Sequence, residues 1–213
     1  MKNKVCIINY GVGNLLCLKR SIEYFNIDVK VVDSNIDLSQ FTHLILPGVG
    51  SFGTAMNFLS NSGLYDTIKE AVIHKKIKLM GICLGMQILF QESEESDNVV
   101  GLGVFKGKNI NLSKEKNFKN QRIPHINWQS IFNTKRQEWE NTILNEINEK
   151  DSFYFLHSFF VRTSQKEIII AETDYNKIII PSVLNYQNIT ACQFHPEKSG
   201  KSGLKIIKNF LQN

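Results

Sequence analysis

The chain has 213 residues, of which 42% are hydrophobic and 21% are charged, a balance typical of a folded protein rather than a disordered one. No apolar run approaches the roughly 18–20 residues that a membrane-spanning helix needs, and the apolar stretch at residues 5–8 is too short for the core of a signal peptide. The net charge is +5, but the basic residues are scattered, and their densest stretch, residues 106–122, is interrupted by Glu115.

These features favour a single domain over residues 1–213 that acts in the cytoplasm, without a membrane or a nucleic acid as partner. For residues 106–122 we expect a solvated hairpin or loop. A contact with an acidic partner surface is the second interpretation of this stretch.

The first hundred residues alternate between two periodicities. Short apolar runs predict strands at residues 5–8, 29–32, 43–46 and 78–82. Apolar residues at three- and four-residue spacing predict helices over residues 14–25, 54–74 (with a break near Gly63) and 84–90. Apolar strands that alternate with helices predict an α/β fold with a mostly parallel central sheet and helices on both faces.

The second half of the chain is richer in short strands. We expect them at residues 99–105, 153–161, 167–171, 177–183 and 189–194, followed by a final helix over residues 203–211. Strands that follow an α/β half predict antiparallel additions to the edge of the one sheet.

The four cysteines are Cys6, Cys17, Cys83 and Cys192, and no pair has the C-x-x-C spacing typical of zinc sites and redox motifs. We therefore expect no metal and no cofactor. Cys6 and Cys192 lie in apolar runs and are interpreted as buried small hydrophobic residues, whereas Cys17 falls within a predicted helix.

Cys83 lies in a different context, because residues 81–85 read GICLG, the cysteine form of the nucleophile elbow. The flanking glycines allow a sharp turn between a strand and a helix, which presents the thiol at the carboxyl edge of the sheet. The following helix directs its N-terminal amides to that point, which favours a thiolate and an oxyanion. A buried cysteine between two glycines by chance is the alternative.

A thiolate nucleophile needs a base, and His195 is the best placed of the five histidines because it follows a predicted strand. Glu197, two residues further on, could hold its second ring nitrogen. The other histidines are interpreted as packing or positioning groups: His43, His74, His125 and His157.

The glycine-rich residues 47–53, PGVGSFG, lack both the GK[ST] ending of a phosphate-binding loop and the G-x-G-x-x-G spacing. They also follow a predicted strand, beside the elbow. We therefore expect them to supply backbone amides to an oxyanion hole, with a plain strand-to-helix turn as the alternative.

Several strings together resemble a known family. GICLGMQ at residues 81–87 with QFHPE at residues 193–197 is similar to the class I (triad) glutamine amidotransferases. The resemblance is closer to the HisH group, the glutaminase subunits of imidazole glycerol phosphate synthase, in these strings: YGVGN at 10–14, PGVGSFG at 47–53, PH at 124–125, YFLHS at 154–158 and HPEKSG at 195–200. It covers residues 5–211 and implies a flavodoxin-like fold.

The resemblance implies a role for each matched position. Cys83 would attack the side-chain amide of L-glutamine, and His195, oriented by Glu197, would transfer the protons. The amide of Leu84 and a loop amide at Gly48 or Val49 would hold the oxyanion. The remaining matched positions would bind the substrate: Gln87, His157, Ser158 and Phe159.

The resemblance also implies a partner, a HisF-like (β/α)8 synthase subunit in a heterodimer. Ammonia would pass to it and react with the ribulosyl aminoimidazole carboxamide intermediate PRFAR, giving imidazole glycerol phosphate and AICAR for histidine biosynthesis. The matched interface positions are Asn14, Trp128, Tyr154 and Lys198.

Three positions depart from the family pattern. Asn9 stands where Asp is common, Asn127 replaces a glycine, and Gln129 replaces an asparagine. Because residues 127–129 would face the partner, a HisH-like paralogue that feeds ammonia to acetamidino-sugar synthesis for surface polysaccharide is the second hypothesis. A free-standing cysteine hydrolase and a non-enzymatic binding subunit are alternatives from other classes.

Overall fold

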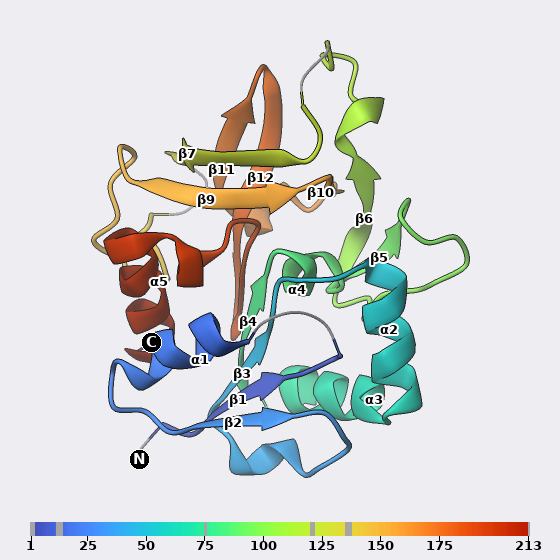
Figure 1. Cartoon of the computed structure of the whole chain (residues 1–213), viewed down its shortest axis with the longest axis vertical. Helices are drawn as coiled ribbons and strands as arrows, with labels where there is room; N and C mark the ends of the chain where they lie inside the picture. The colour runs from blue at the N-terminus through green and yellow to red at the C-terminus, as the bar shows by residue number, and fades with distance from the viewer. Residues whose placement is uncertain (1–2, 12–14, 75, 120–121, 135–137, 213) are drawn as a thin grey trace.

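The computed structural model describes residues 3–11, 15–74, 76–119, 122–134 and 138–212. Its largest sheet has eight strands in the order β2-β1-β3-β4-β13-β12-β11-β8 (Figure 1). The parallel part consists of β1 (Val5–Ile8), β2 (Val29–Val32), β3 (His43–Leu46), β4 (Lys78–Ile82) and β13 (Ile189–Cys192). The antiparallel part consists of β12 (Ile178–Tyr186), β11 (Ile169–Tyr175) and β8 (Phe132–Asn133).

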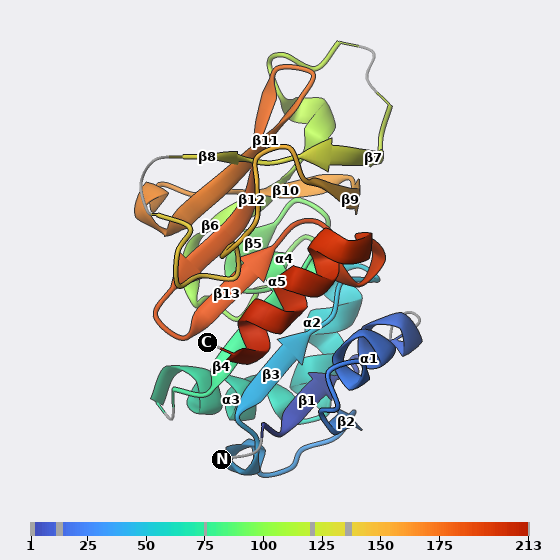
Figure 2. The same ribbon diagram turned by 90° about the vertical axis from the view of Figure 1, so that its left-hand side faces the viewer.

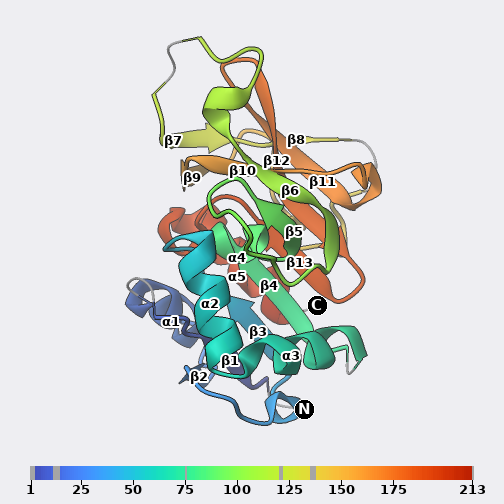
Figure 3. The same cartoon turned by 90° about the vertical axis from the view of Figure 1, so that its right-hand side faces the viewer.

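Helices cover both faces of the parallel strands. Helices α1 (Leu16–Glu23) and α5 (Gly200–Gln212) lie on the face shown in Figure 2. Helices α2 (Phe52–Asn61) and α3 (Leu64–Lys69), the latter continued by a π-helical turn at Glu70–His74, lie on the opposite face (Figure 3). The predicted break near Gly63 is confirmed, because Gly63 adopts a left-handed conformation with φ of 73° between α2 and α3.

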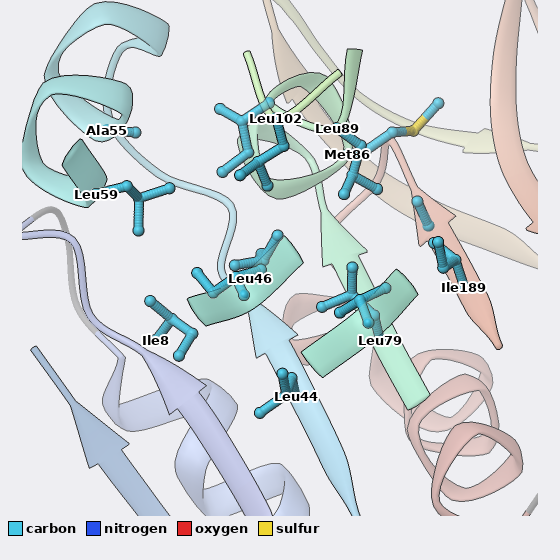
Figure 4. Packing of buried hydrophobic residues seen from close by; sticks show 14 of the residues in the cluster. Ile8, Leu44, Leu46, Ala55, Leu59, Leu79, Met86, Leu89, Leu102 and Ile189 are labelled. Carbon is cyan, nitrogen blue, oxygen red and sulfur yellow. The ribbon is translucent and has the colours of Figure 1, made fainter. Parts of the chain in front are cut away.

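The two cores follow from the alternation of side chains along each strand. Ile8, Leu44 and Leu79 face the core under α2, where Ala55 and Leu59 pack against them (Figure 4). Their neighbours in sequence face the other core, under α1 and α5: Val5, Ile7, Ile45, Met80 and Ile82. Because β1, β3 and β4 are buried on both faces, they appear in the sequence as continuous apolar runs, and this is why they were predictable.

Two smaller sheets lie beyond the end of β4. One has three strands in the order β10-β6-β5, with β5 (Phe90–Ser93), β6 (Phe105–Asn111) and β10 (Phe159–Arg162). The other pairs β7 (His125–Ser130) with β9 (Ser152–His157) in an antiparallel manner, above α4 (Leu84–Gln87) in Figure 1.

The structure corrects five predictions in this region. The helix predicted over 84–90 ends at Gln87, and the strand predicted over 99–105 begins only at Phe105, because these two segments pair with each other through backbone bonds such as Leu102 N–H to Ile88 O (2.8 Å). The single strand predicted over 153–161 breaks at Ser158 into β9 and β10, which pair with different partners. The predicted loop at 106–122 starts as the central strand β6, and the added strands form further sheets instead of joining only the large one.

Other boundaries shift by a few residues. Strands β11 and β12 run on to Tyr175 and Tyr186, strand β13 stops at Cys192, and α5 starts at Gly200. Within the residues that the structure describes, there is no helix of the length and apolarity that crossing a membrane requires.

Candidate active site

Cys83 forms a sharp elbow between β4 and α4. Its backbone is strained, with φ of 47° and ψ of −102°, and its N–H donates to the Cys192 carbonyl at 2.7 Å, which ties the elbow to β13. The flanking glycines allow a close approach: a Cβ at Gly81 would lie 2.7 Å from the Gly85 oxygen, and one at Gly85 would collide with the Leu46 carbonyl. The predicted nucleophile elbow is therefore present in the backbone geometry.

His195 lies beside Cys83 in the bend that follows β13. The His195 N–H donates to the Tyr154 carbonyl at 2.9 Å, and Nδ1 lies 2.8 Å from the Glu197 Oε1. Because Nδ1 faces Glu197, Nε2 is left for the hydrogen bond with the Cys83 sulfur. The structure thus brings together in one line the three residues for which the sequence predicts catalysis.

The electrostatics favour the charged form of the imidazole. Burial alone would lower the pKa of His195, which is only 1% exposed, but the adjacent Cys83 sulfur and the Glu197 carboxylate outweigh burial and raise that pKa to about 10. An imidazolium at this position can stabilise a thiolate on Cys83, so the arrangement suits nucleophilic catalysis.

The Cys83 sulfur has two further neighbours. The Gln193 side-chain amide donates to Sγ at 3.5 Å, and the Leu156 carbonyl lies 3.6 Å from Sγ. Sequence reasoning did not assign a role to Gln193. The signal was its position two residues before His195, since alternation places both side chains on one side of an extended segment.

Gly48 packs directly against the elbow. A Cβ atom at Gly48 would lie 2.9 Å from His195 Cε1 and 3.0 Å from Cys83 Cβ, so only glycine fits without displacing a neighbour. Gly50 has φ of 108°, a conformation that favours glycine. The predicted oxyanion residues Gly48, Val49 and Leu84 all line the same pocket as Cys83.

This pocket has a volume of about 290 Å³. Its lining contains Cys83 and His195 together with the predicted oxyanion and substrate residues, and it has four additions: Gly50, Glu95, Pro124 and Leu156. Glu197 does not line the pocket and contacts His195 instead. Among these lining residues Glu95 has the only carboxylate. It was missed because it lies in an acidic run, residues 92–97, which resembles an ordinary solvated surface in the sequence.

The substrate-side wall is held by hydrogen bonds. The Gln87 side-chain amide donates to the Phe159 carbonyl at 2.8 Å, and the same carbonyl lies 3.0 Å from His157 Nδ1. The other His157 nitrogen, Nε2, lies 3.0 Å from His125 Nδ1. Burial lowers the pKa of His157 to about 3 and that of His125 to about 4, so both rings are neutral near pH 7 and His157 is fixed as part of the wall.

Three of the four predicted interface residues lie together beside His195. The rings of Trp128 and Tyr154 pair across β7 and β9 with centroids 6.0 Å apart, and Lys198 Nζ lies 5.8 Å from the Tyr154 ring centroid. Trp128 is 52% exposed and Ile126 on the same strand face is 55% exposed. Asn14 lies outside the described residues.

The three departures from the family pattern have local contacts. The Asn9 Oδ1 accepts from the Gly11 N–H at 3.1 Å, a contact that an aspartate oxygen could equally make. The Asn127 amide donates to Gln129 Oε1 at 3.4 Å, and the Gln129 amide donates to the Asp174 carbonyl at 3.1 Å. Gln129 therefore connects β7 to β11, whereas the Asn127 contact stays within β7.

Comparisons with known proteins agree with this geometry. A sequence model of the family described as glutamine amidotransferase class-I matches residues 6–213. Over 204 residues the chain is 41% identical to the imidazole glycerol phosphate synthase subunit HisH of Caldanaerobacter subterraneus subsp. tengcongensis, with 96% of this chain and 95% of that protein covered. Over 206 residues it is 40% identical to the subunit of the same name from Methanocaldococcus jannaschii, with 97% of each covered.

Solved structures show the same fold at lower identity. The structure of PurLQS from Thermotoga maritima matches with a TM-score of 0.74 and 19% identity, over 100% of this chain and 99% of that one. A crystal structure of a glutamine amidotransferase matches with a TM-score of 0.72 and 18% identity, over 97% of each chain. These matches confirm the predicted α/β architecture with its mainly parallel sheet and added antiparallel strands.

Proposed function

Because the chain belongs to the class I glutamine amidotransferase family, in the HisH group of imidazole glycerol phosphate synthase subunits, we propose that it hydrolyses L-glutamine at Cys83 and delivers the ammonia to a synthase partner for histidine biosynthesis. The observation that carries this proposal is the hydrogen-bonded series Cys83, His195 and Glu197, of which Cys83 and His195 line a pocket that Glu95 also lines. The proposed location is the cytoplasm.

The chemistry follows from the groups around the sulfur. His195 takes the thiol proton, and the Cys83 sulfur forms a bond to the side-chain amide carbon of glutamine while the carbonyl electron pair moves to oxygen. The amide of Leu84 and a loop amide at Gly48 or Val49 hold this oxyanion. As the C–N bond breaks, His195 gives the proton to departing ammonia.

The second half of the cycle reuses the same residues. His195 removes a proton from water, the resulting hydroxide attacks the thioester carbon, and the C–S bond breaks. Glutamate leaves and Cys83 regains its proton from His195. The Glu197 carboxylate accepts a hydrogen bond from His195 Nδ1 and stabilises the imidazolium in both halves.

Recognition of glutamine requires groups for the α-ammonium and the α-carboxylate at its amino-acid end. Glu95 is the anionic group of the pocket and pairs with the α-ammonium of the substrate. The backbone of residues 157–159, held in place by the Gln87 side chain, faces the amino-acid end. Contacts to these two charged groups distinguish glutamine from a simple amide.

The proposed partner is a HisF-like (β/α)8 synthase subunit that uses the ammonia to convert PRFAR into imidazole glycerol phosphate and AICAR. An exposed apolar patch of Ile126 and Trp128, with Tyr154 and Lys198 beside it, supports a docking surface next to His195. Ammonia released at Cys83 would then form close to the interface.

The test is to mix the purified chain with a HisF-like subunit and to measure association and glutamate release together. Trp128→Ala should weaken association by about tenfold or more, since exposed tryptophans in an interface are frequent hot spots. Tyr24→Ala, directly after α1, is the matched control, because Tyr24 is also an exposed aromatic residue, at 70%. Association that is unaffected by Trp128→Ala, or absent in the wild type, would contradict the proposed partner.

A further inference from the structure

Tyr10 is a fully buried tyrosine whose hydroxyl reaches the glycine loop beside the nucleophile. It lies two residues after β1 and is 0% exposed. Its hydroxyl donates to the carbonyl of Pro47, the residue that directly precedes Gly48. Tyr10 is thus joined by one hydrogen bond to residues 47–50, which we call the oxyanion loop.

The hydrogen bond fixes an entire peptide unit. The Pro47 carbonyl and the Gly48 N–H belong to the same planar group, and this peptide is not among the cis bonds of the described residues. In a trans peptide the C=O and the N–H point in opposite directions. The Tyr10 hydroxyl therefore determines the direction of the Gly48 N–H.

The backbone of Gly48 is too closely packed to shift if the Pro47–Gly48 peptide tilts. A Cβ at Gly48 would lie 2.9 Å from the Ile82 carbonyl oxygen and 2.9 Å from His195 Cε1, so the Gly48 backbone is pressed against the elbow and the base. A tilt of the Pro47–Gly48 peptide would alter the contact of this backbone with the reacting groups.

The phenol is a permanent donor. Burial, followed by the charge of nearby Cys83, raises the pKa of the Tyr10 hydroxyl well above its usual value of 10.0. The proton thus stays on the oxygen at any working pH. Turning the Pro47 carbonyl away would leave a buried hydroxyl without its acceptor, which is an unfavourable state.

We propose that Tyr10 is a positioning residue for the oxyanion loop: its hydroxyl holds the Pro47–Gly48 peptide in one orientation, so that the loop can turn only at the peptides beyond Gly48. The proposal rests on the proposed function, because it assumes that the loop serves glutamine hydrolysis. Under this proposal, the backbone N–H that turns toward the oxyanion belongs to Val49 or Gly50. The Gly48 N–H keeps one orientation.

The test compares two tyrosine-to-phenylalanine variants in the full chain with its synthase partner. Tyr10→Phe removes the hydroxyl and keeps the ring. Tyr65→Phe is the matched control, because the Tyr65 hydroxyl also donates to a carbonyl, that of Gly101, at 3.2 Å, and Tyr65 does not line the pocket of Cys83. Glutamine turnover, the KM for glutamine and the rate of Cys83 alkylation by iodoacetamide are measured for each.

We expect Tyr10→Phe to lower kcat by about tenfold, with KM and alkylation within about twofold of wild type, because only the oxyanion support is disturbed. Tyr65→Phe should match wild type in kcat, in KM and in the rate of alkylation. A kcat for Tyr10→Phe within twofold of wild type, or an equal fall in Tyr65→Phe, would overturn the inference. An inactive wild-type complex would instead contradict the proposed function.

A second measurement needs no variant and remains decisive if Tyr10→Phe fails to fold. In the ¹⁵N-labelled wild-type chain, the amide resonances of Gly48, Val49 and Gly50 are followed while the unlabelled partner is added. The inference requires the Gly48 amide to shift much less than the Val49 and Gly50 amides. Equal shifts of all three amides would show that the Pro47–Gly48 peptide is not held.

Discussion

His195 Nδ1 and Glu197 Oε1 are joined by a hydrogen bond of 2.8 Å, and both side chains are almost completely buried. The second carboxylate oxygen, Oε2, has no hydrogen-bond partner among the described residues. The negative charge of Glu197 is therefore directed at the imidazole. This pair predicts how the two residues divide the catalytic work.

The first prediction is that His195→Ala and Glu197→Ala have unequal effects on glutamine hydrolysis. His195 transfers protons, so its loss should lower kcat by about 10³-fold or more. Glu197 only orients and stabilises the ring, so its loss should lower kcat by about 10- to 100-fold. Steady-state glutaminase assays of both variants with partner measure this. Negligible losses in both would mean that the base lies elsewhere.

The second prediction is that Cys83→Ala abolishes glutamine hydrolysis while the fold persists. Alanine keeps the Cβ at the strained elbow and removes only the sulfur that forms the thioester, so the cost in stability should be small. Glutamate release and thermal unfolding are measured, and the variant complex should still make product when ammonium salt replaces glutamine. Residual glutaminase activity in the purified variant complex would refute the assignment.

The third prediction concerns Glu95, whose Oε2 also accepts from the Phe52 N–H at 2.7 Å. Glu95→Gln should raise the KM for glutamine by about tenfold or more, with a smaller change in kcat, because a charge-assisted contact to the ammonium is lost. Glu94→Gln is the control, because Glu94 is adjacent in sequence but pairs with Lys108 and Lys114 and does not line the pocket of Cys83. A similar KM for both variants would remove Glu95 from the binding site.

The fourth prediction is that the protein loses stability as the pH falls below about 6.5. Burial lowers the pKa of His43 and His125 to about 4 and that of His157 to about 3, whereas an unfolded histidine titrates near 6.5. Between these values the unfolded state binds more protons, so stability rises with pH and falls on acidification.

Each of these histidines should contribute about 1 kcal/mol of lost stability between pH 7 and pH 5.5. His195 does not add to this loss, because its pKa is raised and its contribution fades only as the pH rises from about 6.5 toward 10. Urea unfolding at the two pH values measures the effect, and His43→Gln should remove about a third of it. A free energy of unfolding that is flat over this range would contradict the prediction.

The predictable parts of the molecule are those specified by nearby residues. The elbow at Cys83 could be predicted because its glycines, strand and helix are all adjacent in sequence. The fully buried strands could be predicted because they form continuous apolar runs. The break at Ser158 could not be predicted, because it depends on pairing with distant parts of the chain: β9 pairs with β7, and β10 pairs with β6.

The same distinction applies to the site. Cys83, His195 and Glu197 carried local motifs, whereas Glu95 joins the pocket only because the segment after β5 packs against the start of α2. The contact of Tyr10 with Pro47 joins two strand ends that are 37 residues apart. Tyr10 lies in the matched YGVGN string, but nothing local in the sequence indicates its contact with Pro47 or the place of Glu95 in the pocket.

The last prediction is that the isolated chain is a poor glutaminase and that its partner activates it. Ammonia released without an acceptor would be lost, so coupling of hydrolysis to an occupied synthase site is expected. The physical basis is the oxyanion loop, where Gly50 with φ of 108° permits peptide orientations that other residues avoid. A turn of a peptide beyond Gly48 would exchange a carbonyl for an amide beside the oxyanion.

One such donor is worth roughly 2.7–4 kcal/mol, or about 10²–10³ in rate. Partner binding near Trp128 and Lys198 would favour the productive orientation if the complex contacts that state better, since a ligand shifts an equilibrium only through differential affinity. Glutamine turnover is measured for the chain alone, with the partner, and with the partner and an acceptor analogue, and should rise by about 10²-fold or more across the series. If the isolated chain already hydrolyses glutamine at the rate of the full complex, activation through the oxyanion loop is refuted. The hypothesis of a free-standing cysteine hydrolase is then favoured.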